Sequence, residues 1–249
     1  MPEARIYTAA IVIIGNEILS GRTQDANVAF LGQRLGELGI RLMEVRVVRD
    51  TFEAIGAAVN ALRAEHDYVF TTGGIGPTHD DITSEAIARA FGLPFGRHPE
   101  ADAILRAYYK PEDITEARMS MADTPEGAEL IDNPISRAPG FRVENVYVLP
   151  GVPSILQVMF DGIADGLAGG SPVVSRSVAA NLPEGRVAEP LRAIQDAWPA
   201  VEIGSYPFFK DGKLGASLVM RGADPAAVDG AAADVRKMIV ELGGTPIEE

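Results

Sequence analysis

The chain has 249 residues, with 22 Lys+Arg against 35 Asp+Glu and no cysteine. Its formal net charge of -13 repels nucleic acid and anionic membrane surfaces unless basic residues gather in one patch, and the arginines are scattered. The absence of cysteine excludes disulfides, thiolate metal sites and cysteine nucleophiles. The first apolar run, 6–14, is too short to span a bilayer, so we expect a cytoplasmic protein without nucleic-acid or membrane partners.

The first two thirds of the chain alternate between strand-like and helix-like segments. Continuous apolar runs are typical of strands buried on both faces of a parallel sheet, and apolar residues at helical spacing indicate amphipathic helices. We predict strands at 6–14, 40–48, 68–72 and 145–149, and helices at 28–38, 52–62, 82–91, 99–122 and 153–163. This alternation predicts an α/β fold, with a parallel sheet covered by helices on both faces.

The stretch Leu-Ala-Gly-Gly-Ser-Pro at 167–172 is the strongest linker signal in the chain. Beyond it the patterns predict strands at 173–180, 200–206 and 213–221, and helices at 186–197 and 225–242. We therefore expect a first domain at 1–170 and a small α+β subdomain of β-α-β-β-α order at 171–249.

A glycine-rich turn, T-T-G-G-I-G-P-T-H-D-D at 71–81, follows the predicted strand 68–72. Ligands of open parallel sheets bind beyond the carboxyl ends of the strands, and Gly73, Gly74 and Gly76 would let a phosphate approach main-chain N–H groups closely. The alternative is an ordinary tight turn between strand and helix. The stretch matches neither the dinucleotide fingerprint nor a P-loop.

Two aspartates, Asp80 and Asp81, end this turn and would repel a phosphate unless a divalent cation lay between them and the ligand. Such a cation polarises phosphorus and activates water, which predicts a hydrolytic site. Asp50 closes the strand 40–48 at the same sheet edge and is a third candidate. In the alternative interpretation, Asp50 and one of the pair only cap the helices that follow them.

The residue types around the turn restrict the metal. Oxygen ligands suit magnesium or manganese, while His79 beside the carboxylates also allows cobalt or nickel. His79 can equally face solvent without a role. The sequence contains no G-x-S-x-G or H-E-x-x-H motif, so serine and zinc hydrolases lack support.

Four stretches together resemble the MoaB/Mog molybdopterin-binding superfamily. They are G-N-E-I-L-S-G at 15–21, the turn 71–83, N-P at 133–134 with A-P-G-F at 138–141, and L-P-G-V-P at 149–153. The resemblance covers about residues 6 to 165. Within the superfamily the chain is most similar to the amino-terminal domain of competence/damage-inducible protein A (CinA) and to the molybdopterin-binding-like domain of eukaryotic FAD synthases. G-R-T-Q-D-A-N at 21–27 favours the FAD synthase type.

The resemblance implies a three-layer α/β/α sandwich with a mostly parallel sheet and one pocket. In the molybdenum cofactor branch this pocket binds molybdopterin, and aspartates that match Asp50 and Asp81 are associated with adenylyl transfer. In the CinA and FAD synthase branches a similar site is linked to metal-dependent hydrolysis of ADP-ribose or FAD. The resemblance and the residue patterns together predict these ligand-binding residues: Gly15, Glu17, Asn27, Thr72, Gly73, Gly74, Gly76, Pro150 and Gly151.

The leading hypothesis is a metal-dependent pyrophosphatase that acts on ADP-ribose-like or FAD-like dinucleotides. Asp50 and Asp81 would hold magnesium, manganese or cobalt, Asp80 would assist, and potassium and molybdopterin are further candidate ligands. The alternatives are a molybdopterin-binding protein without hydrolase activity and a regulatory domain with a vestigial pocket. We expect a homodimer, but neither the amidase activity of full-length CinA nor the nucleotidyl transfer of FAD synthase.

Overall fold

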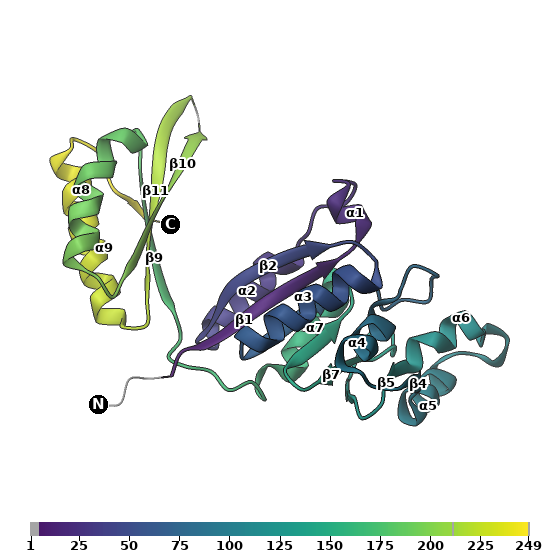
Figure 1. Cartoon of the computed structure of the whole chain (residues 1–249). Helices are drawn as coiled ribbons and strands as arrows, with labels where there is room; N and C mark the ends of the chain where they lie inside the picture. Colours follow the sequence, from purple (N-terminus) through teal and green to yellow (C-terminus); the bar gives the residue numbers. More distant parts are fainter. Residues whose placement is uncertain (1–4, 211, 249) are drawn as a thin grey trace. The chain divides into compact units, whose positions relative to one another are not determined.

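The computed structural model describes residues 5–210 and 212–248 (Figure 1). The chain forms two compact units, Met1–Gly170 and Ser171–Glu249. In the described ranges, no helix combines the length and apolar character that crossing a membrane requires.

The first unit is built on a six-stranded sheet of order β2-β1-β3-β8-β7-β6. Its first four strands are parallel: β1 (Tyr7–Ile14), β2 (Ile40–Val48), β3 (Tyr68–Thr72) and β8 (Val146–Leu149). Two strands that the sequence patterns missed, β6 (Glu129–Ile131) and β7 (Gly140–Val143), add an antiparallel edge. The predicted α/β fold with a mostly parallel sheet is confirmed.

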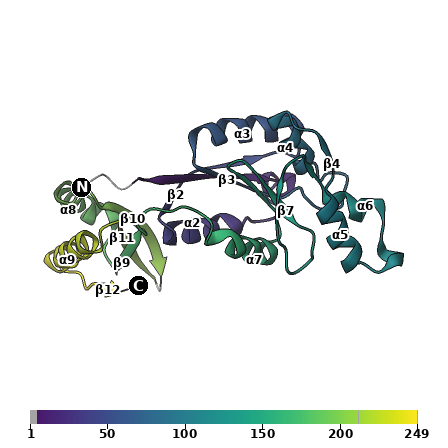
Figure 2. The same cartoon turned by 90° about the horizontal axis from the view of Figure 1, so that it is seen from below.

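Helices cover both faces of this sheet (Figure 2). One face packs on α3 (Phe52–Glu65) and α4 (Thr83–Phe91), where Val12 meets apolar residues of both helices. The other face packs on α2 (Asn27–Glu37) and α7 (Pro153–Ala164) around Phe70 and Phe160. Since successive side chains of a strand point to opposite faces, the apolar run of β1 feeds both cores.

Residues 95–125 form what we call the lobe, at one end of the first unit. The predicted helix 99–122 is wrong, because α5 (Pro99–Tyr108) is followed by η1 (Pro111–Asp113), α6 (Glu116–Met119) and η2 (Ser120–Ala122). Lys110 precedes a proline and is extended, with φ -67° and ψ 152°, which ends the first helical stretch. The two-stranded sheet of β4 (Phe95–Arg97) and β5 (Asp123–Pro125) closes the lobe.

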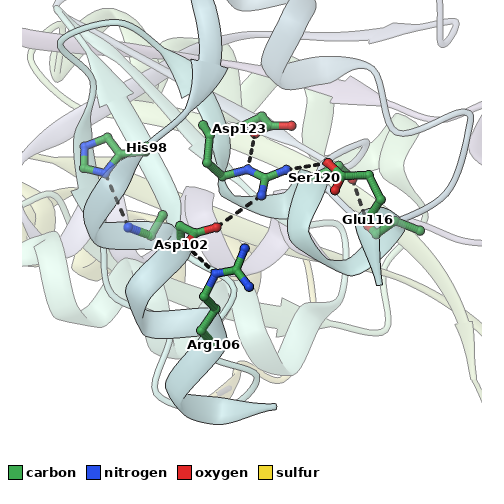
Figure 3. Close-up of polar contacts among 9 residues, drawn as sticks. His98, Asp102, Arg106, Glu116, Ser120 and Asp123 are labelled. Carbon is green, nitrogen blue, oxygen red and sulfur yellow. Dashed lines mark hydrogen bonds and ion pairs between the residues drawn. The ribbon is translucent and has the colours of Figure 1, made fainter. Parts of the chain in front are cut away.

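Arg97 joins the parts of the lobe through carboxylates on three different segments (Figure 3). Its guanidinium lies 2.6 Å from Asp123, 3.1 Å from Asp102 and 2.7 Å from Glu116. Arg106 donates to the second oxygen of Asp102 at 2.6 Å. These bonds tie α5 and α6 to the short sheet, so the lobe relies on paired charges beside its small apolar core.

The second unit is an α+β structure with a four-stranded antiparallel sheet of order β10-β11-β9-β12. Its strands are β9 (Val174–Ala180), β10 (Glu202–Lys210), β11 (Lys213–Gly222) and β12 (Ile247–Glu248), the last of which was not predicted. Two helices, α8 (Glu184–Ala197) and α9 (Pro225–Glu241), cover one face of this sheet (Figure 1). The expected α+β character of this part is confirmed.

Candidate functional site

A cavity of about 520 Å³ lies at the carboxyl ends of β1, β3 and β8. This is the position at which open parallel sheets bind ligands, because the loops that leave adjacent strands converge there. Several separate stretches of the first unit form its wall. The lining residues are Ile13, Ile14, Glu17, Ile18, Thr23–Asn27, Thr72–Gly76, Asp81, Met121, Asn133, Ser136, Ala138, Pro150–Pro153 and Ile155.

Most of the residues predicted to bind ligand line this one cavity. They are Glu17, Asn27, Thr72, Gly73, Gly74, Gly76, Pro150 and Gly151, and Asp81 lines it with them. Gly15, Asp50 and Asp80 do not line it. Gly15 instead lies beneath the carboxylate of Glu17, since a Cβ at position 15 would be 2.5 Å from Glu17 Oε1.

The glycine-rich turn is fixed by hydrogen bonds to its neighbours. Gly73 N–H donates to the Leu149 carbonyl at 3.1 Å. Thr83 donates two hydrogen bonds to the turn, from its N–H to Gly74 O and from its hydroxyl to Gly73 O. Gly73 has φ +99°, and a Cβ there would lie 2.3 Å from the Ile14 carbonyl oxygen. Only glycine fits this position.

The next three N–H groups, those of Gly74, Ile75 and Gly76, donate to no acceptor in the described part of the chain. All three residues line the cavity, and α4 begins shortly after them at Thr83. Unpaired main-chain N–H groups before a helix favour an anion, because they carry partial positive charge. The turn can therefore hold a phosphate oxygen.

Asp81 is half-buried against this turn. Its Oδ2 accepts from Thr78 N–H at 2.8 Å, and a Cβ on Gly76 would lie 2.7 Å from the same oxygen. The Thr78 hydroxyl lies within hydrogen-bond distance of both Asp80 and Asp81, and its single proton serves one of them at a time. This hydroxyl lowers the pKa of Asp80 below its ordinary value. The side chain of His79, which precedes Asp80 in the chain, is 98% exposed.

The interpretation of the aspartates as caps of the helices that follow them is wrong. Thr51 caps α3 by accepting from Ala54 N–H, and α4 starts after Ile82 without a side-chain cap. Asp50 instead accepts from the N–H of Asn16 at 2.8 Å. Asn16 begins the short helix α1 (Asn16–Leu19), which sequence patterns missed. Asp50 thus connects the end of β2 to the loop of Glu17.

Charge on the cavity wall is entirely negative. Three carboxylates line it, those of Glu17, Asp25 and Asp81, which we call the cavity carboxylates, and no Lys or Arg does. None of the three forms an ion pair with a residue that the structure describes. A ligand that enters must therefore bring a cation or hydrogen-bond donors.

One group of three metal-ligating side chains lies within 4.8 Å of one another among residues 5–210 and 212–248. It consists of Glu44, Glu65 and His66, none of which lines the cavity. The aspartates predicted to bind metal do not form such a cluster in the described structure.

The sequence patterns missed several wall residues. The stretch 23–26 lines the cavity as a run, and its only signal was its place in G-R-T-Q-D-A-N. Met121, Ser136 and Ala138 reach the wall from distant segments, the first of them from the lobe. No local pattern marks such residues, because their position depends on how the chain folds back.

A cavity at the carboxyl ends of parallel strands, within a three-layer α/β unit, is the place where proteins of this architecture bind small molecules. Comparison with known families identifies the family of this domain. Residues 10–169 match the probable molybdopterin binding domain, and the chain belongs to this family. Residues 172–243 match the FAD synthase middle domain.

Individual relatives agree with this assignment. A protein of Aeropyrum pernix is 35% identical over 261 residues, and the match covers 97% of each of the two chains. A probable FAD synthase of Caenorhabditis briggsae is 33% identical, and the match covers 85% of the chain but 45% of that protein. The crystal structure of CinA from Thermoplasma acidophilum aligns with TM-score 0.62 and 34% identity, over 65% of the chain and 98% of that structure.

Proposed function

We propose that the chain is a metal-dependent nucleotide-diphosphate hydrolase that acts on ADP-ribose-like or FAD-like dinucleotides. The observation that carries the proposal is the meeting of opposite features in one cavity. Free N–H groups of Gly74, Ile75 and Gly76 attract an anion, and the half-buried carboxylate of Asp81 beside them repels it. A phosphate that carries a divalent cation satisfies both features.

The donor set fits such a cation. The charged groups at the cavity are carboxylates, and hard oxygen donors suit magnesium, manganese or cobalt. Asp81 at the cavity wall and Asp50, which lies outside the wall at the end of β2, are the proposed holders; Asp50 uses one oxygen for Asn16 N–H, and its other oxygen makes no hydrogen bond in the described chain. When bound, the cation neutralises these carboxylates and makes phosphorus more electrophilic.

The residues of the chain have separate roles in the proposed reaction. The N–H groups of 74–76 hold phosphate oxygens, and Asp80 assists from outside the cavity wall, where it shares the Thr78 hydroxyl with the wall residue Asp81. Water forms a new P–O bond to one phosphorus while the bond from that phosphorus to the bridging oxygen breaks. One phosphate monoester leaves with the bridging oxygen, the other keeps the oxygen of water, and the protons of water go to solvent. The remaining wall, formed by 23–27 with Asn133, Ser136 and Ala138, contacts the nucleoside end.

The comparisons support a nucleotide-related enzyme. The match to the FAD synthase middle domain and the similarity to a probable FAD synthase favour a flavin or adenine nucleotide as ligand. The finer assignments, which are pyrophosphate hydrolysis, a bound divalent metal, a homodimer and a cytoplasmic location, are part of this proposal.

A hydrolysis assay tests the proposal. ADP-ribose, FAD and NAD are each incubated with magnesium, manganese or cobalt, or with EDTA, and the released nucleoside monophosphate is quantified. We expect turnover of at least one dinucleotide with a divalent ion, none in EDTA, and a rate at least about 100-fold lower for Asp81→Asn. No turnover of any of the three with any ion would remove the proposal.

The family match favours one second candidate, a protein that binds molybdopterin and does not hydrolyse it. The same turn would hold the pterin phosphate. Purification from a host that makes the cofactor tests this candidate, because retained pterin is detected by its fluorescence after oxidation. Retained pterin together with an inactive hydrolysis assay would favour it over the first proposal.

A further inference from the structure

Two asparagines of the cavity wall are almost fully buried but differ in how their amides are used. Asn133, 2% exposed, uses its whole hydrogen-bonding capacity. Its Oδ1 accepts from the N–H groups of Ile135 and Ser136, both at 3.1 Å, and its Nδ2 donates to Ser136 Oγ and Ala138 O. The amide of Asn133 therefore holds its own loop together.

Asn27 is 3% exposed and lies at the start of α2. Its Nδ2 donates to the Gly151 carbonyl at 2.9 Å, whereas its buried Oδ1 meets no donor anywhere in the described chain. A flipped amide would place two oxygens against each other at Gly151, so the bond to Gly151 fixes which atom is free. The free atom is the acceptor.

A buried carbonyl oxygen without a donor costs about 1 to 3 kcal/mol, and a ligand donor removes this cost. Asn27 lines the cavity in the same run as Thr23 and Gln24, and its Nδ2 bonds Gly151, which packs against Gly73 of the glycine-rich turn. The wall contains no Lys or Arg that could reach this oxygen. A donor on a bound ligand can therefore satisfy this oxygen.

We propose that Asn27 Oδ1 accepts a hydrogen bond from an uncharged N–H or O–H group of the bound ligand, and so selects ligands that carry an amino or hydroxyl group at that point. This inference rests on the proposed function, because the ligand is the same dinucleotide. ADP-ribose offers three sources of the donor: the base amine, the adenosine hydroxyls and the terminal ribose.

Binding measurements with matched ligands identify the source. Affinities of ADP-ribose and three analogues, each with a methylene group in place of the oxygen that bridges the two phosphorus atoms so that hydrolysis is blocked, are measured by calorimetry in the presence of Mn²⁺. One analogue has hypoxanthine in place of adenine, the second lacks the adenosine 2′ and 3′ hydroxyls, and the third is ADP, which lacks the terminal ribose. The wild-type protein and Asn27→Leu are compared, because leucine is similar in volume but has no acceptor.

We expect the wild-type protein to bind one analogue about 10-fold more weakly than ADP-ribose. Asn27→Leu should bind this analogue and ADP-ribose with equal affinity. The ratio of affinities is the readout, since general damage to the cavity would weaken both ligands. Asn27→Ala serves as a second variant if leucine prevents folding. Equal ratios in wild type and variant for all three analogues would overturn the inference.

An amide oxygen can also bind a cation, and Mn²⁺ affinity separates the two roles. We expect the same Mn²⁺ affinity for wild type and Asn27→Leu; a loss of about 10-fold would show that Oδ1 serves the metal and would overturn the inference. Failure of the proposed function appears differently, as ADP-ribose that binds without being hydrolysed. The affinity ratios decide the role of Asn27 in that case too.

Discussion

Acidic side chains have opposite surroundings in the lobe and in the cavity. In the lobe, carboxylates from three segments contact one guanidinium; they belong to Asp102, Glu116 and Asp123. At the cavity wall, the three cavity carboxylates contact no Lys or Arg in the described chain. The same chemical group is thus neutralised within the protein in one region and left to an external partner in the other.

The carboxylates of the lobe thus support the fold, whereas the cavity carboxylates are available to a ligand. Paired carboxylates stabilise the native state, and removing one partner leaves the other unpaired. At the cavity, main-chain N–H groups bond Asp25 and Asp81, but no cation of the described chain pairs with the cavity carboxylates, so their charge is open to a cation that a ligand brings. The lobe therefore predicts effects on unfolding, whereas the cavity predicts effects on ligand affinity.

Gly73→Ala should have the largest effect on stability, because the glycine-rich turn depends on its backbone conformation and not on charge. The new Cβ would lie 2.3 Å from a main-chain oxygen at φ +99°, and we expect a loss of about 3 kcal/mol in the free energy of unfolding. Gly21→Ala is the control, since Gly21 has φ +73° with no atom within 4 Å. Urea titration measures both; equal losses would contradict a steric role for Gly73.

Arg97→Met should cost about 2 kcal/mol of unfolding free energy, since Asp102 and Asp123 are mostly buried and would lose a partner. Arg106→Met is the matched control, because Arg106 is half-exposed and, among the residues that the structure describes, pairs with Asp102 alone. We expect that variant to lose at most about 0.5 kcal/mol. Similar losses in the two variants would show that Arg97 does not organise the lobe.

Acid should weaken the lobe. Arg106 first, and Arg97 with it, hold the pKa of Asp102 below its ordinary value. A carboxyl group with a lowered folded-state pKa stabilises the protein above its unfolded-state pKa, and this contribution is lost as pH falls through the folded-state pKa. We therefore expect urea titrations from about pH 5 to about pH 3 to show a smaller decline for Asp102→Asn than for wild type. An identical decline would contradict the pairing.

Asp81→Asn should have the smallest effect on stability, within about 0.5 kcal/mol, because asparagine still accepts from Thr78 N–H. Asp123→Asn makes the same chemical change in the lobe, where the carboxylate contacts Arg97 at 2.6 Å, and should cost about 1 to 2 kcal/mol. Thermal unfolding of the two variants gives the contrast. A larger loss for Asp81→Asn would indicate a structural charge at the cavity.

The sequence predicted the elements whose signal is local. The apolar run of β1, the glycines after β3 and the proline that starts α7 each lie within one short stretch. The lobe was not predicted because its strands have three residues each and its charge pairs join distant segments. Asn27 was predicted to bind ligand, but the sequence could not show that its Oδ1 is the free atom, since this depends on a carbonyl 124 positions away.

The central claim is that a cation must neutralise the cavity carboxylates before a phosphate can bind the free N–H groups. Calorimetric titration of the methylene-bridged, non-hydrolysable analogue of ADP-ribose into the wild-type protein, with Mn²⁺ and with EDTA, tests it most directly. Two unit charges near a protein surface interact by a few kcal/mol, so we predict affinity about 100-fold higher with Mn²⁺. Equal affinity in EDTA would contradict the account, because the ligand would then bind beside unneutralised carboxylates.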